Sequence, residues 1–330
     1  MPRPAALLIA SAVAVPAILL ATTALHSEPA SPENIVLIPH RDQPVEVGQV
    51  AWGRNFDGAL KASETSGKPV LVLFQEVPGC SGCQDFGKEV LSHPLIVEAI
   101  ESAFEPVLVF NNRSSGQDPE LLKRYNEPSW NYQVMRFLKP DGEDLIPRRD
   151  RIWTVPAVAE RLIEALEAAD RPVPAYLQTV RASEKTTGLA EVAFSQYCFW
   201  TGEHKLGQLD GVVHTEAGFF DGHEVTRVVY DPSVLPLKTL ADHAVKSDVA
   251  DRIYTTDGVN PTALPAGRLT EAYRAAPASD QKRQLIRQPQ WRNVPALNAM
   301  QLTKINAFAP RGADAALQWL SPRQRAVLDQ

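Results

Sequence analysis

The chain contains 330 residues, which is long enough for two ordinary domains and too long for one small module. Hydrophobic residues make up 44% and charged residues 22%, a globular composition that excludes a wholly disordered chain. The net charge of −6 argues against a nucleic-acid partner, and three cysteines, which cannot all pair with one another, exclude a disulfide scaffold.

The first 27 residues have the pattern of a targeting segment. Arg3 is the one basic residue there, and the run from Pro4 to Leu25 is uncharged. A secretory signal peptide has this order, and Thr22 and Ala24 provide the small side chains that cleavage requires. The run is also long enough for a membrane span, so residues 1–27 are predicted to be a signal peptide or a membrane anchor. Either predicts a periplasmic or otherwise extracytoplasmic protein.

Residues 28–169 predict a first domain in which strands alternate with helices. Val70 to Phe74 is a short, continuous apolar run, which is typical of a strand buried on both faces of a sheet. Other strands are expected at 35–38, 106–110 and 134–138, and helices at 56–66, from the turn at 76–83 through Val90, and at 157–169. This alternation predicts an α/β sandwich.

Prolines and small polar residues divide the rest of the chain. Residues 170–189 contain Arg171-Pro-Val-Pro174 and are predicted to form a linker. Residues 190–275 predict a second domain, and residues 276–330 a proline-punctuated helical tail. Strands of the second domain are expected at 192–194, 211–213 and 224–230 with a helix at 232–244, and helices of the tail at 296–308 and 313–329.

Cys80 and Cys83 are three residues apart, directly after a predicted buried strand and at the start of a predicted helix. A thiol at a helix N-terminus is favoured as thiolate, and a partner one turn on can close a disulfide reversibly. The alternatives are a static disulfide and half of a zinc site, for which His93 is the one further ligand nearby. The context favours a redox-active disulfide, with Cys80 as the exposed, low-pKa thiol. We predict no metal site, since the histidines lack ligand spacing.

The segment from Trp52 to Ala169 resembles the secreted branch of the thioredoxin-like superfamily. The resemblance lies in W…AL…GKPVLVLF followed by the cysteine pair. It implies a thioredoxin-like sandwich and a thiol–disulfide function for Cys80 and Cys83. One departure is that Asn131-Tyr132-Gln133 stands where the family places a cis-proline before its next strand.

The third cysteine, Cys198, lies among aromatic side chains in the run Tyr197-Cys198-Phe199-Trp200. An unpaired thiol in an oxidising compartment is a liability unless it is buried or used. Two interpretations remain open on spacing alone. One is a buried cysteine in an aromatic core, and the other is an apolar pocket for a methyl or thioether group.

Residues 190 to about 255 resemble the A-type peptide-methionine sulfoxide reductases. The resemblance is carried by VAFSQYCFWTGE and by LDGVVHTEAGFFDGHEVTRVVYDPSVLPLKTL. It implies a ferredoxin-type α/β domain in which Cys198 is the nucleophile. It further implies that Phe199 and Trp200 hold the substrate methyl group, and that Glu224, six residues before Tyr230, is the acid that protonates the sulfoxide oxygen.

The sequence departs from this family at several positions. Gln196-Tyr197 replaces a Gly-Gly pair, and Phe219 stands in the substrate pocket where the family has a tyrosine. We expect Tyr254 to supply the lost hydroxyl in the substrate-binding site. The C-terminal resolving cysteines of the family are absent.

Together these features predict a peptide-methionine (S)-S-oxide reductase whose thioredoxin-like domain is its internal thiol reductant. The expected substrate is oxidised methionine, in proteins or free. No cofactor is expected beyond an external thiol reductant, which an upstream thiol–disulfide relay protein would supply. One alternative is a thiol–disulfide oxidoreductase with a non-catalytic MsrA-like binding domain, and another is a non-enzymatic envelope protein that has kept both folds.

Overall fold

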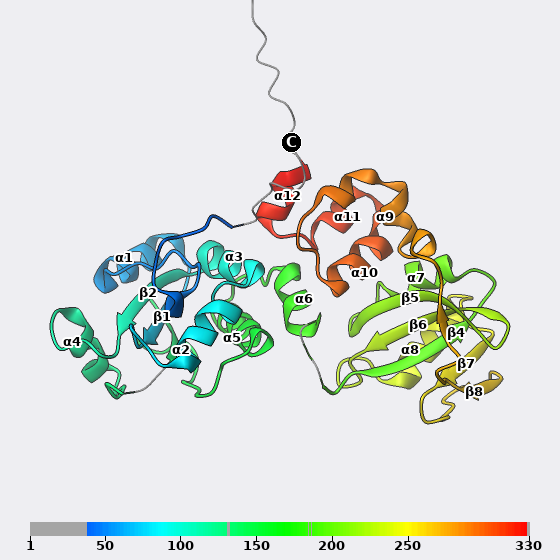
Figure 1. Cartoon of the computed structure of the whole chain (residues 1–330), viewed down its shortest axis with the longest axis horizontal. Helices are drawn as coiled ribbons and strands as arrows, with labels where there is room; N and C mark the ends of the chain where they lie inside the picture. The colour runs from blue at the N-terminus through cyan, green and yellow to red at the C-terminus, as the bar shows by residue number, and fades with distance from the viewer. Residues whose placement is uncertain (1–37, 131–132, 184, 186, 329–330) are drawn as a thin grey trace, which may run out of the picture. The chain divides into compact units, whose positions relative to one another are not determined.

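The computed structural model describes residues 38–130, 133–183, 185 and 187–328. The predicted signal peptide or anchor and all but the last residue of the predicted strand 35–38 lie outside these residues. No helix in the described ranges is both long and apolar enough to span a bilayer. Helices surround two separate sheets, which confirms the predicted mixed α/β class (Figure 1).

The first sheet has three strands in the order β2-β1-β3. The central strand β1 (Val70–Gln75) pairs in parallel with β2 (Glu105–Phe110) and antiparallel with β3 (Gln133–Leu138). Every residue of β1 is buried, because Leu71 and Leu73 enter one apolar cluster and the alternate residues enter another on the opposite face. Burial on both faces explains the continuous apolar run in the sequence.

Helices cover both faces of this sheet. The helices α3 and α5 pack over the face of Leu71 and Leu73, whereas α1 and α4 pack over the other. The segments are η2 (Val45–Val47), α1 (Phe56–Ser66), α2 (Ser81–Asp85), the π-helical turn η3 (Phe86–Val90), α3 (Pro94–Ala103), α4 (Gln117–Arg124) and α5 (Val155–Ala168). Asn55 caps α1 by accepting from the Gly58 N–H, and Thr154 caps α5 in the same way.

The predicted linker at 170–189 contains a helix, α6 (Ala175–Ser183). Tyr176, Leu177 and Val180 of α6 are buried in the same cluster as α3 and α5. The prolines before α6 end α5 as expected, but the apolar residues that follow recur at helical spacing and dock the chain back onto the first domain. The connection between the two domains is therefore shorter than the sequence predicted.

The second sheet has the strand order β8-β7-β4-β6-β5-β9. All neighbouring strands are antiparallel except β7 and β8. The strands are β4 (Ala190–Ser195), β5 (Val212–Phe220), β6 (His223–Tyr230), β7 (Arg252–Thr255), β8 (Ala266–Arg268) and β9 (Arg274–Ala275). Two helices, α7 (Phe199–Leu206) and α8 (Leu237–Lys246), pack over the same face of this sheet.

The tail does not begin as a separate unit at residue 276. Gln281 and Lys282 insert against β5, so the second domain continues past its predicted end at residue 275. The remaining segments are η4 (Ala278–Asp280), α9 (Arg283–Arg287), η5 (Pro289–Asn293), α10 (Ala299–Phe308), η6 (Ala309–Arg311), α11 (Ala313–Leu317) and α12 (Pro322–Leu328). Pro322 divides the predicted helix 313–329 into α11 and α12.

Candidate active site

The cysteine pair lies in the turn between β1 and α2. Cys80 is the N-cap residue of α2 and is exposed, whereas Cys83 lies inside the helix and is fully buried. The two Sγ atoms are 3.4 Å apart, and both thiols are free. The buried strand β1 ends five residues before Cys80, so the rigid sheet sets the position of the turn.

The two thiols differ in their electrostatic surroundings. The backbone N–H and the thiol of Cys83 hydrogen-bond to Cys80 and lower the pKa of Cys80 below its usual value. Burial and, after it, the neighbouring Cys80 raise the pKa of Cys83 to about 12. A thiolate is the nucleophilic form of cysteine, so the structure favours Cys80 as the attacking thiol.

Three polar side chains adjoin the pair and were not singled out from the sequence as site residues. The Oε1 atom of Gln133 lies 3.8 Å from the Cys83 Sγ, at a position where the resemblance expected proline. Gln75 donates to the Cys83 carbonyl oxygen at 3.4 Å. Glu76 places a carboxylate oxygen within 4.8 Å of both sulfur atoms. Two thiols and one carboxylate give three donors, one fewer than a structural zinc site uses.

Cys198 is the N-cap residue of α7 and is half-buried. Its carbonyl oxygen accepts from the Thr201 N–H at 3.1 Å, which begins the helix. Glu224 lies at the start of β6, and its Oε2 atom accepts from the Phe199 N–H at 3.1 Å. The pairing of β4 with β6, in which Ser195 faces Val225, brings Glu224 to the end of β4 where α7 begins. The predicted nucleophile and acid therefore share one helix N-terminus.

Aromatic side chains cluster at the start of α7, where Cys198 is the N-cap residue. The ring centroid of Phe199 lies 5.7 Å from that of Trp200 and 5.6 Å from that of Phe219, in edge-to-face arrangements. Phe219 pairs with Glu224 across β5 and β6, so both side chains lie on the sheet face that α7 covers. The structure thus brings five of the predicted residues together: Cys198, Phe199, Trp200, Phe219 and Glu224.

Tyr254 does not join this group. It pairs with Ala193 across β7 and β4, and strand alternation places both on the sheet face opposite to that of Glu224. The ring of Tyr254 packs against Phe220 at 4.9 Å, and its hydroxyl donates to Asp221 at 3.3 Å. The expected replacement of the missing hydroxyl by Tyr254 therefore has no support in the structure, because strand register was not visible in the sequence.

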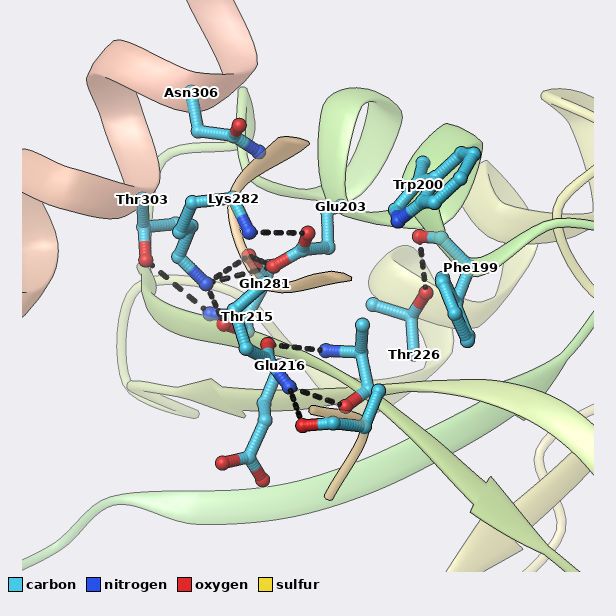
Figure 2. A network of polar contacts seen from close by, with 12 residues as sticks. Phe199, Trp200, Glu203, Thr215, Glu216, Thr226, Gln281, Lys282, Thr303 and Asn306 are labelled. Carbon is cyan, nitrogen blue, oxygen red and sulfur yellow. Dashed lines mark hydrogen bonds and ion pairs between the residues drawn. The ribbon is translucent and has the colours of Figure 1, made fainter. Parts of the chain in front are cut away.

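A buried ion pair lies behind α7. The Lys282 Nζ atom is 2.7 Å from the Oε1 atom of Glu203, which is fully buried (Figure 2). Burial raises the pKa of Glu203, and the Lys282 charge opposes that rise. Glu203 follows Cys198 by five residues, but no sequence pattern connects it with Lys282, which stands 79 residues further along the chain.

Comparison with known proteins gives two separate matches. The family model described as thioredoxin-like matches residues 51–140. Peptide methionine sulfoxide reductase MsrA of Vibrio vulnificus is 38% identical over 74 residues, which cover 17% of this chain and 35% of that protein. The MsrA of Methanosarcina mazei is 33% identical over 72 residues, covering 17% of this chain and 34% of that protein. The chain thus spans about a third of the length of these relatives.

The solved structure of a DsbH oxidoreductase is 16% identical, with a TM-score of 0.31, and covers 40% of this chain and 92% of its own. The thioredoxin-like match and the paired thiols support an oxidoreductase. The chain therefore joins a thioredoxin-like domain to a segment that is similar to part of the MsrA peptide methionine sulfoxide reductases.

Proposed function

We propose that this protein is a peptide-methionine (S)-S-oxide reductase and that its thioredoxin-like domain is the internal thiol reductant. The observation that supports this most strongly is the position of Glu224. Its carboxylate accepts from the N–H of Phe199, the residue that follows Cys198, and the Phe199 ring packs against that of Trp200. A nucleophile, an acid and an apolar surface for a methyl group are the parts that sulfoxide reduction requires.

In the first step the Cys198 thiolate attacks the sulfoxide sulfur while Glu224 donates a proton to the sulfoxide oxygen. The attack forms a bond between the Cys198 sulfur and the substrate sulfur. The protonated oxygen then passes as a hydroxyl group from the substrate sulfur to the Cys198 sulfur while the bond between the two sulfurs breaks, so that methionine leaves and Cys198 becomes a sulfenic acid. Methionine sulfoxide is reduced by two electrons to methionine, and Cys198 is oxidised by two.

In the second step the Cys80 thiolate attacks the Cys198 sulfur, a disulfide forms, and hydroxide leaves as water after taking up a proton. Cys83 then attacks Cys80, releases the Cys198 thiolate and closes the 80–83 disulfide. The negative charge of Cys80 contributes to the raised pKa of Cys83. That contribution is lost once Cys80 is bonded to Cys198, so the mixed disulfide itself favours deprotonation of Cys83.

An external dithiol must finally reduce the 80–83 disulfide with two electrons. We assign this role to an upstream thiol–disulfide relay protein in an extracytoplasmic compartment, in keeping with the targeting pattern of residues 1–27. The substrate class is oxidised methionine, in proteins or free. The reaction needs no metal and no cofactor besides the thiol reductant.

The test is turnover of methionine-S-sulfoxide by the purified protein with dithiothreitol as reductant. Cys198→Ser is expected to abolish turnover, because Cys198 is the proposed nucleophile. Cys80→Ser is expected to retain it, because dithiothreitol can reduce the sulfenic acid directly. Absence of turnover by the folded wild-type protein contradicts the proposal.

One observation favours a second candidate function. Phe219 lacks a hydroxyl, and Tyr254 lies on the opposite face of the sheet, so Glu224 is the one predicted proton donor beside Cys198 in the described residues. The alternative is a thiol–disulfide oxidoreductase whose MsrA-like domain only binds partners. It predicts disulfide reduction that requires Cys80 and Cys83 and is unchanged in Cys198→Ser.

A further inference from the structure

Residues 280–284, which we call the strap, lie along α7 and β5, and each of them has a polar or charged contact. The Asp280 carbonyl oxygen accepts from the Trp200 Nε1 at 2.9 Å. The Gln281 side chain pairs with the backbone of Ala217 in both directions, at 3.0 Å to its N–H and 2.7 Å to its carbonyl oxygen. At the far end the Gln284 N–H donates to a side chain of α10 at 2.9 Å.

Lys282 fixes the middle of the strap. Its backbone N–H donates to the Oε2 atom of Glu203 at 3.1 Å, and its Nζ atom donates to the Oε1 atom of the same carboxylate at 2.7 Å. The Nζ atom also donates to the Thr215 carbonyl oxygen (Figure 2). Both charged side chains are buried. A buried charge is costly unless its partner and hydrogen bonds remain in place, so this pair holds the strap on α7.

The strap contacts Trp200 at two places on the ring. The Asp280 carbonyl oxygen holds the indole N–H at the edge, and the Arg283 guanidinium lies 4.8 Å from the ring centroid. A cation over an indole face is attracted by the ring quadrupole. Arg283 directly follows Lys282, so the ion pair sets where the guanidinium lies.

The Cys198 end of α7 is held by other contacts. The Phe199 N–H donates to Glu224, and the Phe199 carbonyl oxygen accepts from the Thr226 hydroxyl at 3.0 Å. Both contacts come from β6, and neither involves the strap. Loss of the strap is therefore expected to release Trp200 while Cys198 and Glu224 stay where they are.

We propose that Lys282 and Arg283 are positioning residues that hold Trp200 as the wall of the methyl-binding pocket. This inference rests on the proposed function, because the pocket binds a methyl group only if the substrate is methionine sulfoxide. The substrate site is then completed by a segment beyond the region that resembles the sulfoxide reductases. Neither residue contacts substrate; each acts through Trp200.

The first experiment compares Arg283→Leu with the matched control Arg287→Leu, which changes an exposed arginine of the same short helix. Removing one cation from an indole face is expected to raise KM for methionine-S-sulfoxide by about fivefold. The kcat is expected to change little, because the reacting groups are untouched, and Arg287→Leu is expected to behave as wild type. A fall in kcat with unchanged KM, or equal effects of the two variants, overturns the proposal.

The second experiment removes the ion pair without leaving an unpaired charge, in the double variant Glu203→Gln/Lys282→Met. Circular dichroism checks that it folds. The emission of Trp200 is obtained as the difference between each protein and the same protein carrying Trp200→Phe. In the double variant this emission is expected to shift to longer wavelength and to be quenched more strongly by acrylamide.

The fluorescence measurement needs no turnover, so it separates the two proposals. An unchanged Trp200 emission in the folded double variant shows that the strap does not position Trp200. If the Trp200 emission changes in the double variant but the wild-type protein never reduces methionine sulfoxide, the result supports the positioning role of the strap and contradicts the proposed function. Arg283→Leu, which leaves the ion pair intact, gives the same readout if the double variant does not fold.

Discussion

The difference between Cys80 and Cys83 comes from the places of the two residues on one short helix. Cys80 precedes the first turn of α2 and accepts a hydrogen bond from the backbone N–H of Cys83. Cys83 itself lies within the helix, where it is buried next to β1 and Gln133. The sequence predicted this asymmetry because the spacing along the chain puts Cys80 at the start of the helix and Cys83 one turn inside it. The family resemblance placed Gln133 in the segment that faces the cysteines, but the sequence did not predict a contact between its side chain and the Cys83 thiol.

The asymmetry predicts a pH-dependent order of alkylation. The pKa of Cys80 is lowered and that of Cys83 is raised to about 12, so iodoacetamide at mildly acidic pH should label Cys80 first in the reduced protein. The Cys80 rate should reach half its plateau below the pH of an ordinary thiol. Peptide mapping after short reaction times measures the order. Preferential labelling of Cys83 contradicts the assignment.

Glu224 offers a second test at the residue scale. Glu224→Gln keeps an oxygen that can accept from the Phe199 N–H, so the start of α7 should be preserved. The amide cannot donate the proton of a carboxylic acid, and sulfoxide reduction should fall by on the order of a hundredfold. Glu216→Gln, on the opposite face of the neighbouring strand, is the control and should leave the rate unchanged. An equal rate in Glu224→Gln and wild type removes Glu224 from the reaction.

At the scale of elements, local sequence patterns correctly predicted individual helices and strands, but they did not predict which elements contact one another. The helix α1 (Phe56–Ser66) has the bounds that its apolar spacing and Gly67 indicated. The sequence did not predict the helix α6, because the prolines before it indicated a linker over residues 170–189. Tyr254 was placed wrongly relative to the site because sheet register, which decides its face, depends on pairing between distant strands.

The helix α10 carries a buried lysine that makes stability depend on pH. Lys304 donates to the Leu209 carbonyl oxygen at 2.6 Å, and burial lowers its pKa to about 8. The unfolded chain binds this proton up to a higher pH than the folded protein does. The contribution of Lys304 to the free energy of unfolding is therefore greatest above the unfolded pKa of about 10.5. It decreases as the pH falls from there and is lost once the pH has fallen through the folded pKa of about 8.

Lys304→Met should remove this dependence. The free energy of unfolding of wild type, relative to that of the variant, should rise between pH 8 and 10, by about 1.4 kcal/mol for each pH unit in that interval. Urea unfolding of both proteins across this range measures the difference, in which contributions from tyrosines and cysteines cancel. Parallel pH profiles would show that Lys304 titrates alike in the folded and unfolded protein.

For the whole molecule, the central question is whether electrons pass between the two redox sites. The chain has three cysteines, of which two form the pair in the thioredoxin-like domain and one is Cys198. Neither site is complete without the other under the proposed reaction, since Cys198 has no resolving thiol in its own domain. Direct transfer requires that the Sγ atoms of Cys80 and Cys198 approach to ~2 Å.

A Cys83→Ser variant treated with methionine sulfoxide should therefore accumulate an intramolecular disulfide between Cys80 and Cys198. Nothing remains in that variant to resolve it, and peptide mapping by mass spectrometry should recover the two cysteine peptides as one joined species. Cys80→Ser is the matched control and should give no disulfide between Cys83 and Cys198, because the Cys83 thiol is fully buried and burial raises its pKa. If Cys83→Ser instead yields a sulfenic acid at Cys198 that dimedone traps, with Cys80 still reduced, the domains do not exchange electrons. An external thiol would then have to regenerate Cys198, and the paired thiols would act on another protein.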